Sequence, residues 1–435
     1  MAVLFFLLGG TIPVPAQPMK PCGTSILAKK RLAKGRRAAS RRHTAPIRAA
    51  YTGEKRGLII LIEFPDASFQ GDDPRQTWTD IANQPGYADY QAKGCVSDYF
   101  CDQSYGQFRL TFDVVGPVEA RHPYAYYGDN IDMGEDIGYF DKNVGELVEE
   151  ACRGVADQVS FADYDWDDDG EVEEVFLLYA GHGENDYYHR DSTVIWPHMA
   201  CLSIDWPGYE RSLTLQGKRI DIYACSNEIN ASGELSGLGT FCHEFSHCLG
   251  LPDLYDTKTG RSVLGRYDLM DAGCYSGDSW CPVGYSSYER YACGWLTPME
   301  TDNPAAVESL HPLHQEPDVR IYRPSDDASD CYLIENRQKE SWDTYFPKAG
   351  LLCWHIDYDA LAWAENTVNN DPEHLRVEHM KVSNIPVGIA PTSLSSPLPS
   401  GIYNLYGQPI VQPSRSDVYI LRYADGSTKK IKLRE

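Results

Sequence analysis

The chain has 435 residues, of which 42% are hydrophobic, so it is long enough to bury the cores of two or three domains. It carries 39 Lys and Arg against 63 Asp and Glu, a formal net charge of −24. A protein this acidic is not expected to use nucleic acid or an anionic membrane as its main partner.

The amino-terminal 54 residues differ in composition from the rest of the chain. A short apolar run, Val3–Leu8, is followed by Val14 and Ala16, a pattern that suits a signal peptide over residues 1–16. Residues 17–54 are basic and lack apolar periodicity, which predicts a prosegment or linker. The apolar run is too short to span a bilayer as a mature helix. We therefore expect a secreted or cell-surface protein with no membrane span in its mature form.

The pattern of apolar residues predicts the core elements that follow. Continuous or alternating apolar runs predict strands at 57–64, 107–115, 172–180 and 351–356. Helical spacing predicts a helix from Asp141, as its N-cap, to Val159, and another over 236–249. Beyond about residue 300 the pattern changes to short strands. This order predicts an α+β fold.

An acidic loop precedes the strand expected at 172–180. Calcium takes six to eight oxygen ligands, and alternate carboxylates around a turn glycine can supply several of them. The candidate ligands are Asp165, Asp167, Asp169, the Glu171 carbonyl and Glu173. The loop is not an EF-hand, because its twelfth position would be Phe176. A solvated acidic turn is the alternative, but so many like charges favour a bound cation.

The helix expected at 236–249 carries the zinc motif HExxH. His243 and His247, four residues apart, project from one face and can bind one zinc ion. Glu244 lies beside that face, where it can act first as general base and then as general acid. Gly250 then allows a sharp turn, and Asp253 returns a third, carboxylate ligand. This extended spacing makes a chance match to the motif far less probable.

The segment from Asp268 to Gly273 contains Met270 and follows the motif at a distance that suits a methionine turn beneath the zinc. Tyr275, just past this turn, could support the transition state by similarity to tyrosines near the methionine turn in related groups. An ordinary packed tyrosine is the alternative for that residue.

Thirteen cysteines is an odd number, so not all of them can pair within one chain. Cys95 and Cys101 could bridge a loop. Most of the others lie in apolar surroundings and are expected to be buried thiols, for example Cys242 and Cys248.

These motifs resemble the immune inhibitor A family of secreted metallopeptidases, a metzincin-like group, in the form found in Bacteroidetes. The similarity extends over roughly residues 55–380. Further segments that carry it are Asp98–Phe100, Ser104–Phe108, Ile195–His198, Leu251–Asp256, Tyr288–Arg290, Gly294–Pro298, Glu335–Gln338 and Trp354–Tyr358. The resemblance implies a metzincin-like fold, a zinc cofactor with Asp253 as third ligand, and endopeptidase activity on protein or peptide substrates. One departure is Tyr267, where the family usually has tryptophan before the turn.

The expected architecture is a zinc peptidase domain over 55–300 and a β-rich continuation over 301–385. A small β module over 400–435 resembles the sorting domain of type IX secretion, which would make that machinery a partner; closing hairpins of the main domain are the alternative. We expect a monomer. Two other functions stay open from the sequence, a catalytically weak zinc-bearing surface binding or adhesion protein and an amidase that acts on a non-protein substrate.

Overall fold

The computed structural model describes residues 51–132, 139–185, 191–203, 210–324, 329–385, 401–403, 418–422 and 428–432. The predicted signal peptide and nearly all of the basic segment lie outside these residues. The chain divides into two compact units, residues 1–385 and 386–435, and each is described by itself. Within the described residues, no helix is both long and apolar enough to cross a membrane.

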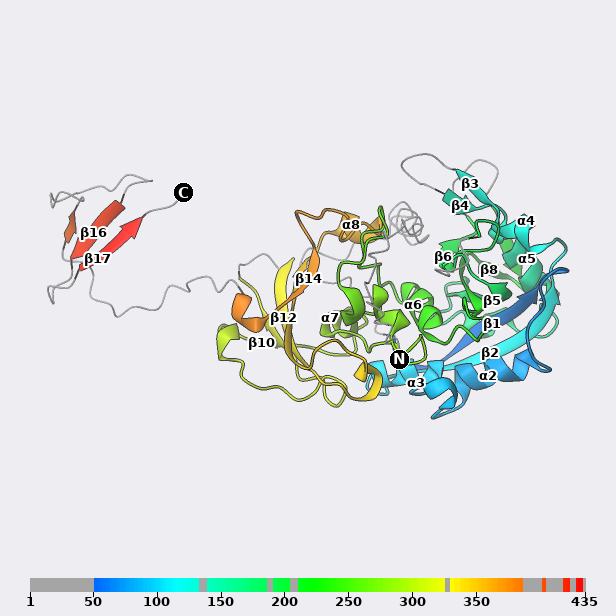
Figure 1. Ribbon diagram of the computed structural model, residues 1–435, viewed down its shortest axis with the longest axis horizontal. Helices are drawn as coiled ribbons and strands as arrows, with labels where there is room; N and C mark the ends of the chain where they lie inside the picture. The colour runs from blue at the N-terminus through cyan, green and yellow to red at the C-terminus, as the bar shows by residue number, and fades with distance from the viewer. Residues whose placement is uncertain are drawn as a thin grey trace, which may run out of the picture. The chain divides into compact units, whose positions relative to one another are not determined.

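The first sheet of the larger unit has five strands, and all but one of them run parallel to their neighbours (Figure 1). In sheet order the strands are β2 (Phe108–Glu119), β1 (Gly53–Glu63), β5 (Val175–His182), β9 (Ile222–Ile229) and β6 (His198–Cys201). Only β6, at one edge, runs antiparallel to its neighbour. The apolar run Leu58–Ile62 is buried throughout, because packed elements cover both faces of the central strands.

Helices cover this sheet. Their bounds are α2 (Pro74–Asn83), α3 (Val96–Gln103), α4 (Tyr124–Gly128), α5 (Val144–Gly154) and α6 (Gly239–Cys248). Helix α5 contacts β1 and β2, while α6 contacts β9 and β6. The apolar residues of α5 recur at helical spacing and are buried, as the sequence predicts.

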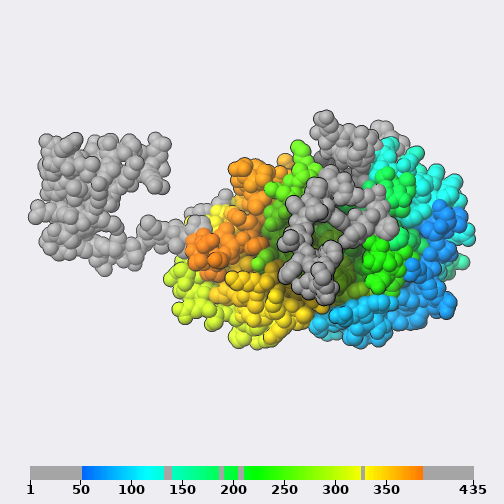
Figure 2. Space-filling view, viewed as in Figure 1, coloured from blue at the N-terminus to red at the C-terminus, as the bar shows by residue number. Residues whose placement is uncertain are grey.

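The second sheet belongs to the same unit. Its order is β10 (Met299–Glu300), β11 (Arg320–Tyr322), β12 (Asp330–Arg337), β13 (Gly350–Asp357) and β14 (Val377–Met380). The helices beside it are α7 (Ser287–Ala292) and α8 (Ala360–Ala364). In Figure 1, α6 lies between the two sheets. In the space-filling view the yellow and orange residues after about 300 continue the surface of the green and cyan residues before them (Figure 2).

Buried polar contacts tie the second sheet to the segment that precedes it. Arg337 of β12 forms ion pairs with Glu335 at 3.2 Å and Asp343 at 2.5 Å, and it donates to the carbonyl of Gly284 at 2.8 Å. Glu335 in turn accepts a hydrogen bond from the backbone of Ser287 at 2.6 Å. Buried charges with satisfied partners of this kind hold the two regions in one arrangement.

The remaining elements are short. They are the hairpins β3 (Asn130–Asp132)–β4 (Tyr139–Asp141) and β7 (Leu213–Leu215)–β8 (Lys218–Ile220), and the 3₁₀ turns η1 (Asp89–Gln91), η2 (Phe161–Tyr164), η3 (Gly265–Tyr267), η4 (Ala272–Tyr275), η5 (Pro304–Ala306), η6 (Ser341–Asp343) and η7 (Val382–Asn384). The second unit contains an antiparallel sheet of β15 (Gly401–Tyr403), β16 (Val418–Arg422) and β17 (Thr428–Lys432). The molecule is therefore a mixed α/β fold with a carboxyl-terminal β-sheet.

The predicted strands and helices are all present, but three details of the sequence analysis are wrong. The helix predicted to reach Val159 ends at Gly154. Asp141 is not the N-cap of α5, because Asn143 takes that position. Asp141 instead ends β4, and its buried carboxylate accepts a hydrogen bond from Trp196 N at 3.0 Å. Cys95 and Cys101 form no bridge; both are free thiols, and Cys95 caps α3 by accepting a hydrogen bond from Asp98 N.

Candidate metal centre

Helix α6, which carries the zinc motif, is buried along its whole length. At its start, Gly239 N donates to the carbonyl of Ser279 at 2.8 Å, which satisfies a backbone donor that the helix leaves open. Only glycine fits at 239, because a Cβ there would lie 1.9 Å from the Cys274 carbonyl oxygen. Phe241 stacks on Phe176 of β5, with ring centroids 3.8 Å apart. The sheet on one side and the 274–279 turn on the other therefore fix the helix.

Three buried donor atoms meet at the end of α6. Asp253 Oδ1 lies 3.1 Å from His243 Nε2 and 3.4 Å from His247 Nε2. A tetrahedral zinc ion with ligands at about 2.0–2.1 Å separates neighbouring donor atoms by roughly 3.3 Å. Two imidazoles and one carboxylate are also a donor set that catalytic zinc commonly uses. The residues therefore fit zinc in type, number and spacing.

Hydrogen bonds to backbone carbonyls fix which nitrogen of each imidazole carries the proton. His243 Nδ1 donates to the carbonyl of Leu269 at 2.9 Å, and His247 Nδ1 donates to that of Leu251 at 2.7 Å. Because a carbonyl can only accept, Nδ1 bears the hydrogen in both neutral rings and Nε2 presents a lone pair. A second contact of this kind is usual for histidines that bind metal.

The loop after α6 brings Asp253 back to the two histidines. Gly250, with φ +89°, ends the helix in a backbone conformation that glycine adopts at little cost. The Asp253 side chain is fully buried. Burial opposes ionisation, but positive charge at the His247 and His243 positions, where a metal cation would also lie, holds the pKa of Asp253 well below the usual carboxyl range. The third donor is therefore a carboxylate.

Glu244 lies beside this group without replacing Asp253 in it. Its Oε2 is 4.0 Å from His247 Nε2, and only 6% of the residue is exposed. Ligand atoms of His243, Glu244 and His247 all lie within 4.8 Å of one another. The carboxylate is therefore placed to exchange a proton with a molecule bound at the same point.

The methionine turn contacts the centre through its backbone. The carbonyl of Leu269 accepts from His243, as described, and the carbonyl of Met270 accepts from Leu254 N at 2.9 Å. Tyr275, which ends η4, is 39% exposed. The turn η4 contacts α6, which brings Tyr275 near the helix that carries the zinc motif.

The acidic loop brings together three of the four carboxylates predicted as calcium ligands. Ligand atoms of Asp165, Asp167 and Glu173 lie within 4.8 Å of one another. Burial, together with the charges of those two aspartates, raises the pKa of Glu173 to about 7. A lysine already sits at this group, since Lys218 Nζ lies 2.6 Å from Asp165 Oδ2.

The other two predicted calcium ligands are the Asp169 carboxylate and the Glu171 backbone carbonyl. The carboxylate of Asp169 accepts from Glu171 N at 2.9 Å. The side chain of Glu171, which is not the predicted ligand, pairs with Arg219 of β8. The sequence offered no sign of Lys218 or Arg219 as neighbours, because they approach the loop from a separate hairpin.

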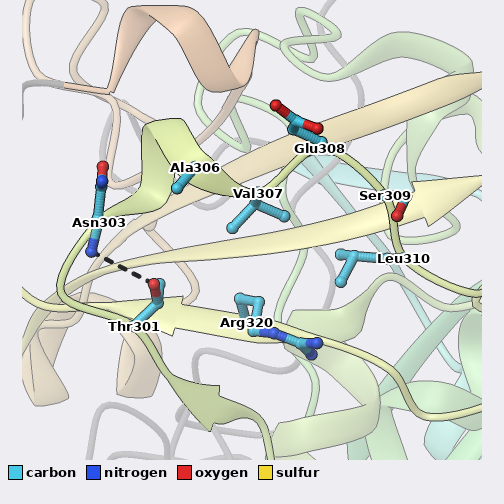
Figure 3. A pocket seen from close by; sticks show the side chains of 8 residues that line it. All are labelled: Thr301, Asn303, Ala306, Val307, Glu308, Ser309, Leu310 and Arg320. Atoms are coloured by element: carbon cyan, nitrogen blue, oxygen red, sulfur yellow. Dashed lines mark hydrogen bonds between the residues drawn. The ribbon is translucent and has the colours of Figure 1, made fainter.

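A cavity of about 330 Å³ opens beside β11 (Figure 3). Its lining residues are Thr301, Asn303, Ala306, Val307, Glu308, Ser309, Leu310 and Arg320. Glu308 and Arg320 are the charged members of this lining, and none of the metal-centre residues belongs to it. The candidate metal centre is therefore separate from this cavity.

Comparison with known proteins agrees with the geometry of the centre. Residues 48–292, more than half of the chain, match the Immune inhibitor A peptidase M6 catalytic domain. The chain belongs to this family. The match contains the HExxH zinc motif and ends at the last residue of α7, before the second sheet.

Two curated relatives show how far the similarity extends. Pre-pro-metalloprotease PrtV of Vibrio cholerae is 26% identical over 296 residues, which cover 57% of this chain and 31% of the relative. Immune inhibitor A of Bacillus thuringiensis is 23% identical over 300 residues, which cover 58% of this chain and 43% of the relative. The chain therefore spans less than half the length of these curated relatives.

One contact of the metal centre was not anticipated from the sequence. The carboxylate of Asp253 is held by Asn366, a residue 113 positions further along the chain. The local signal at Asn366 is weak, because an asparagine just after a short helix is ordinary capping chemistry. Its meeting with Asp253 depends on the packing of the second sheet.

Proposed function

We propose that this protein is a secreted zinc endopeptidase that hydrolyses peptide bonds of protein or peptide substrates with a metzincin-like arrangement. One observation carries the proposal: Asp253 Oδ1, His243 Nε2 and His247 Nε2 converge at the spacing of a zinc site, with Glu244 beside them. Membership of the M6 family supports the same activity.

Each residue has a role that follows from its position. His243, His247 and Asp253 would hold the zinc ion. When bound, zinc lowers the pKa of a coordinated water from about 15.7 to about 7 and polarises the substrate carbonyl. Glu244 accepts a proton from the attacking water and delivers it to the leaving nitrogen. The Tyr275 hydroxyl donates to the oxygen that becomes negative in the transition state.

Digestion of a denatured protein tests this function against the two alternatives. The purified full-length chain is incubated with the substrate alone, with a chelator, and with the chelator followed by added zinc. Cleavage that stops with chelator and returns with zinc is expected. Zinc bound at one ion per chain without any cleavage would favour a binding or adhesion protein. Hydrolysis of small amides with no cleavage of protein would favour an amidase.

A second proposal is that the acidic loop binds calcium. The approach of Asp165, Asp167 and Glu173 supports it, since a cation would offset the repulsion among three carboxylates. Lys218 already neutralises one of these charges, so calcium would compete with its ammonium group or complete the ligands around it.

Calcium titration of the melting temperature tests this second proposal. Added calcium should raise the melting temperature as ln(1 + [L]/Kd), and the Asp167→Ala, Asp169→Ala double variant should lose the rise. Lys218→Met should strengthen it, because the competing cation is gone. An unchanged response in the double variant would place the ion elsewhere.

The location and maturation of the protein are also proposals. The apolar amino-terminal run supports export, and so does the name of the Vibrio cholerae relative, which describes a pre-pro-protein. The antiparallel sheet after residue 400 suits a sorting module of type IX secretion. The monomeric state stays a prediction. The assignment to the Bacteroidetes form of the family also stays a prediction, and the relatives from Vibrio and Bacillus do not support it.

Terminal sequencing of the protein from its natural host tests the maturation proposal. We expect a mature amino terminus between residues 42 and 56 and loss of the chain from about residue 400. Active, exported enzyme that retains residues 18–50 would reject the prosegment.

A further inference from the structure

The third member of the metal centre has two carboxylate oxygens with different partners. Asp253 Oδ1 faces the two imidazoles at 3.1 and 3.4 Å. Asp253 Oδ2 accepts a hydrogen bond of 2.6 Å from Asn366 Nδ2. The same asparagine accepts a hydrogen bond of 2.7 Å from the backbone N–H of Asp253 through its Oδ1. One side chain thus clamps both the backbone and the carboxylate of Asp253.

We propose that Asn366 is the positioning residue for the metal ligand Asp253, and that the region after residue 300 completes the metal centre. The proposal rests on the proposed function, because it takes Asp253 as a zinc ligand. Asn366 lies outside residues 48–292, the part of the chain that matches the family's catalytic domain, whereas Asp253 lies within it.

The chemistry of the contact fixes the orientation of the amide. Asp253 N–H requires an acceptor and the ionised carboxylate requires a donor, so Oδ1 and Nδ2 of Asn366 can each occupy only one place. Asp253 and Asn366 are 0% and 1% exposed, so water does not compete for these bonds. A hydrogen bond to a buried carboxylate is among the stronger kinds. The carboxylate is therefore held with Oδ1 toward the histidines.

Helix α8 presents Asn366 for this task. Thr367 N donates to Ala362 O at 2.9 Å and Asn366 N donates to Trp363 O at 3.3 Å, the hydrogen-bond pattern of a Schellman cap. Asn366 has φ +53°, the left-handed conformation of the residue that follows such a helix end. Glycine is the residue most often found there, and asparagine is the next choice. Asparagine adds the side chain that reaches Asp253.

A second clamp lies four residues along and provides a control. Asn370 Oδ1 accepts from Thr257 N at 2.8 Å, and Asn370 Nδ2 donates to Thr257 Oγ1 at 3.0 Å. It ties the same two segments together, as α8 and the loops after α6 lie side by side in Figure 1. It does not touch Asp253, so loss of this clamp weakens the docking of the loop without releasing the metal ligand.

The test compares Asn366→Gly with Asn370→Gly in the full-length chain. Glycine at 366 keeps the helix cap and the positive φ, and removes only the clamp. Zinc affinity is measured by competition between Zn²⁺ and a chelating indicator, together with the melting temperature of the zinc-free protein. We expect Asn366→Gly to weaken zinc binding by about 10- to 100-fold. Asn370→Gly should lower the melting temperature of the zinc-free protein and leave zinc affinity unchanged.

Cobalt reports the geometry of the centre independently of activity. The visible absorption of the cobalt-substituted protein should change in Asn366→Gly and remain that of the parent in Asn370→Gly. Should Asn366→Gly fail to fold, Asn366→Asp keeps the size and the acceptor for Asp253 N but sets an oxygen against Asp253 Oδ2. That variant should bind zinc less tightly than the parent chain.

Two results would overturn the proposal. Zinc affinity equal to that of the parent in the folded variant at 366 would show that Asp253 needs no clamp. An equal loss of zinc affinity in both glycine variants would show that Asn366 only helps to dock the two segments and does not position Asp253. Failure of the proposed function gives a different result, since the parent chain would then bind no zinc or His247→Ala would keep it. If His247→Ala loses zinc but the variants at 366 keep it, the zinc site is correct and only the role assigned to Asn366 is wrong.

Discussion

A buried carboxyl pair beneath the methionine turn makes stability depend on pH. Asp268 and Glu289 are both fully buried, and each has its pKa raised above the usual carboxyl range, primarily by burial. Asp268 accepts a hydrogen bond from Met270 N at 2.9 Å. The protonation state of its carboxyl group therefore affects the methionine turn directly. Replacing Asp268 by asparagine keeps the shape and removes the ionisation.

The size of the effect follows from the pKa of Asp268, which burial raises to about 6. An ordinary aspartate has a pKa of about 3.9, and a difference of about two pKa units corresponds to about 3 kcal/mol. The folded chain binds this proton more tightly than the unfolded chain. The stabilising contribution is therefore complete below about pH 4 and is lost as the pH rises through about 6.

Denaturant unfolding of the full-length chain between about pH 4 and pH 7 measures this dependence. Asp268→Asn should match the parent chain near pH 4 and exceed its free energy of unfolding by up to about 3 kcal/mol near pH 7. Asp302→Asn, an exposed position, serves as the control and should follow the parent throughout. Parallel curves for Asp268→Asn and the parent would refute the reasoning.

Three further predictions follow from packing and from the site. Gly239→Ala should lower both the melting temperature and the zinc content, because its Cβ would collide with the Cys274 carbonyl; unchanged zinc content would show that the turn can move aside. Phe245→Ala should reduce the free energy of unfolding by about 3–5 kcal/mol, since the ring is buried against other aromatic rings; a loss below about 1 kcal/mol would contradict tight packing there. Tyr275→Phe should lower kcat about 100-fold with KM unchanged if its hydroxyl supports the transition state, and an unaltered kcat would make it an ordinary surface tyrosine.

The zinc motif was predictable because its geometry is local. Residues four apart on a helix share a face wherever the helix lies, so His243 and His247 could be assigned to one ion from spacing alone. Asp253 follows within ten residues of His243, and Gly250 indicates the turn between them. The strand β1 was predictable for a similar reason, since a continuous apolar run indicates a strand buried on both faces.

The contacts that were missed all join segments far apart in the sequence. Asn366 and Asp253 are separated by 113 residues, and Lys218 and Asp165 by 53. No periodicity or spacing relates such pairs, because only the packing of a sheet or hairpin brings them together. The error at Asp141 has the same origin. An aspartate near a helix start favours capping, but Trp196 from a distant segment supplies a donor for its carboxylate.

The central claim is that His243, His247 and Asp253 hold zinc and that Glu244 moves the proton. The measurement that tests it most directly is zinc content and peptidase activity of Glu244→Ala, with Glu119→Ala at an exposed position of β2 as the matched control. Glu244→Ala should retain about one zinc ion per chain and lose nearly all activity, whereas Glu119→Ala should keep both. Full activity in Glu244→Ala would contradict the account.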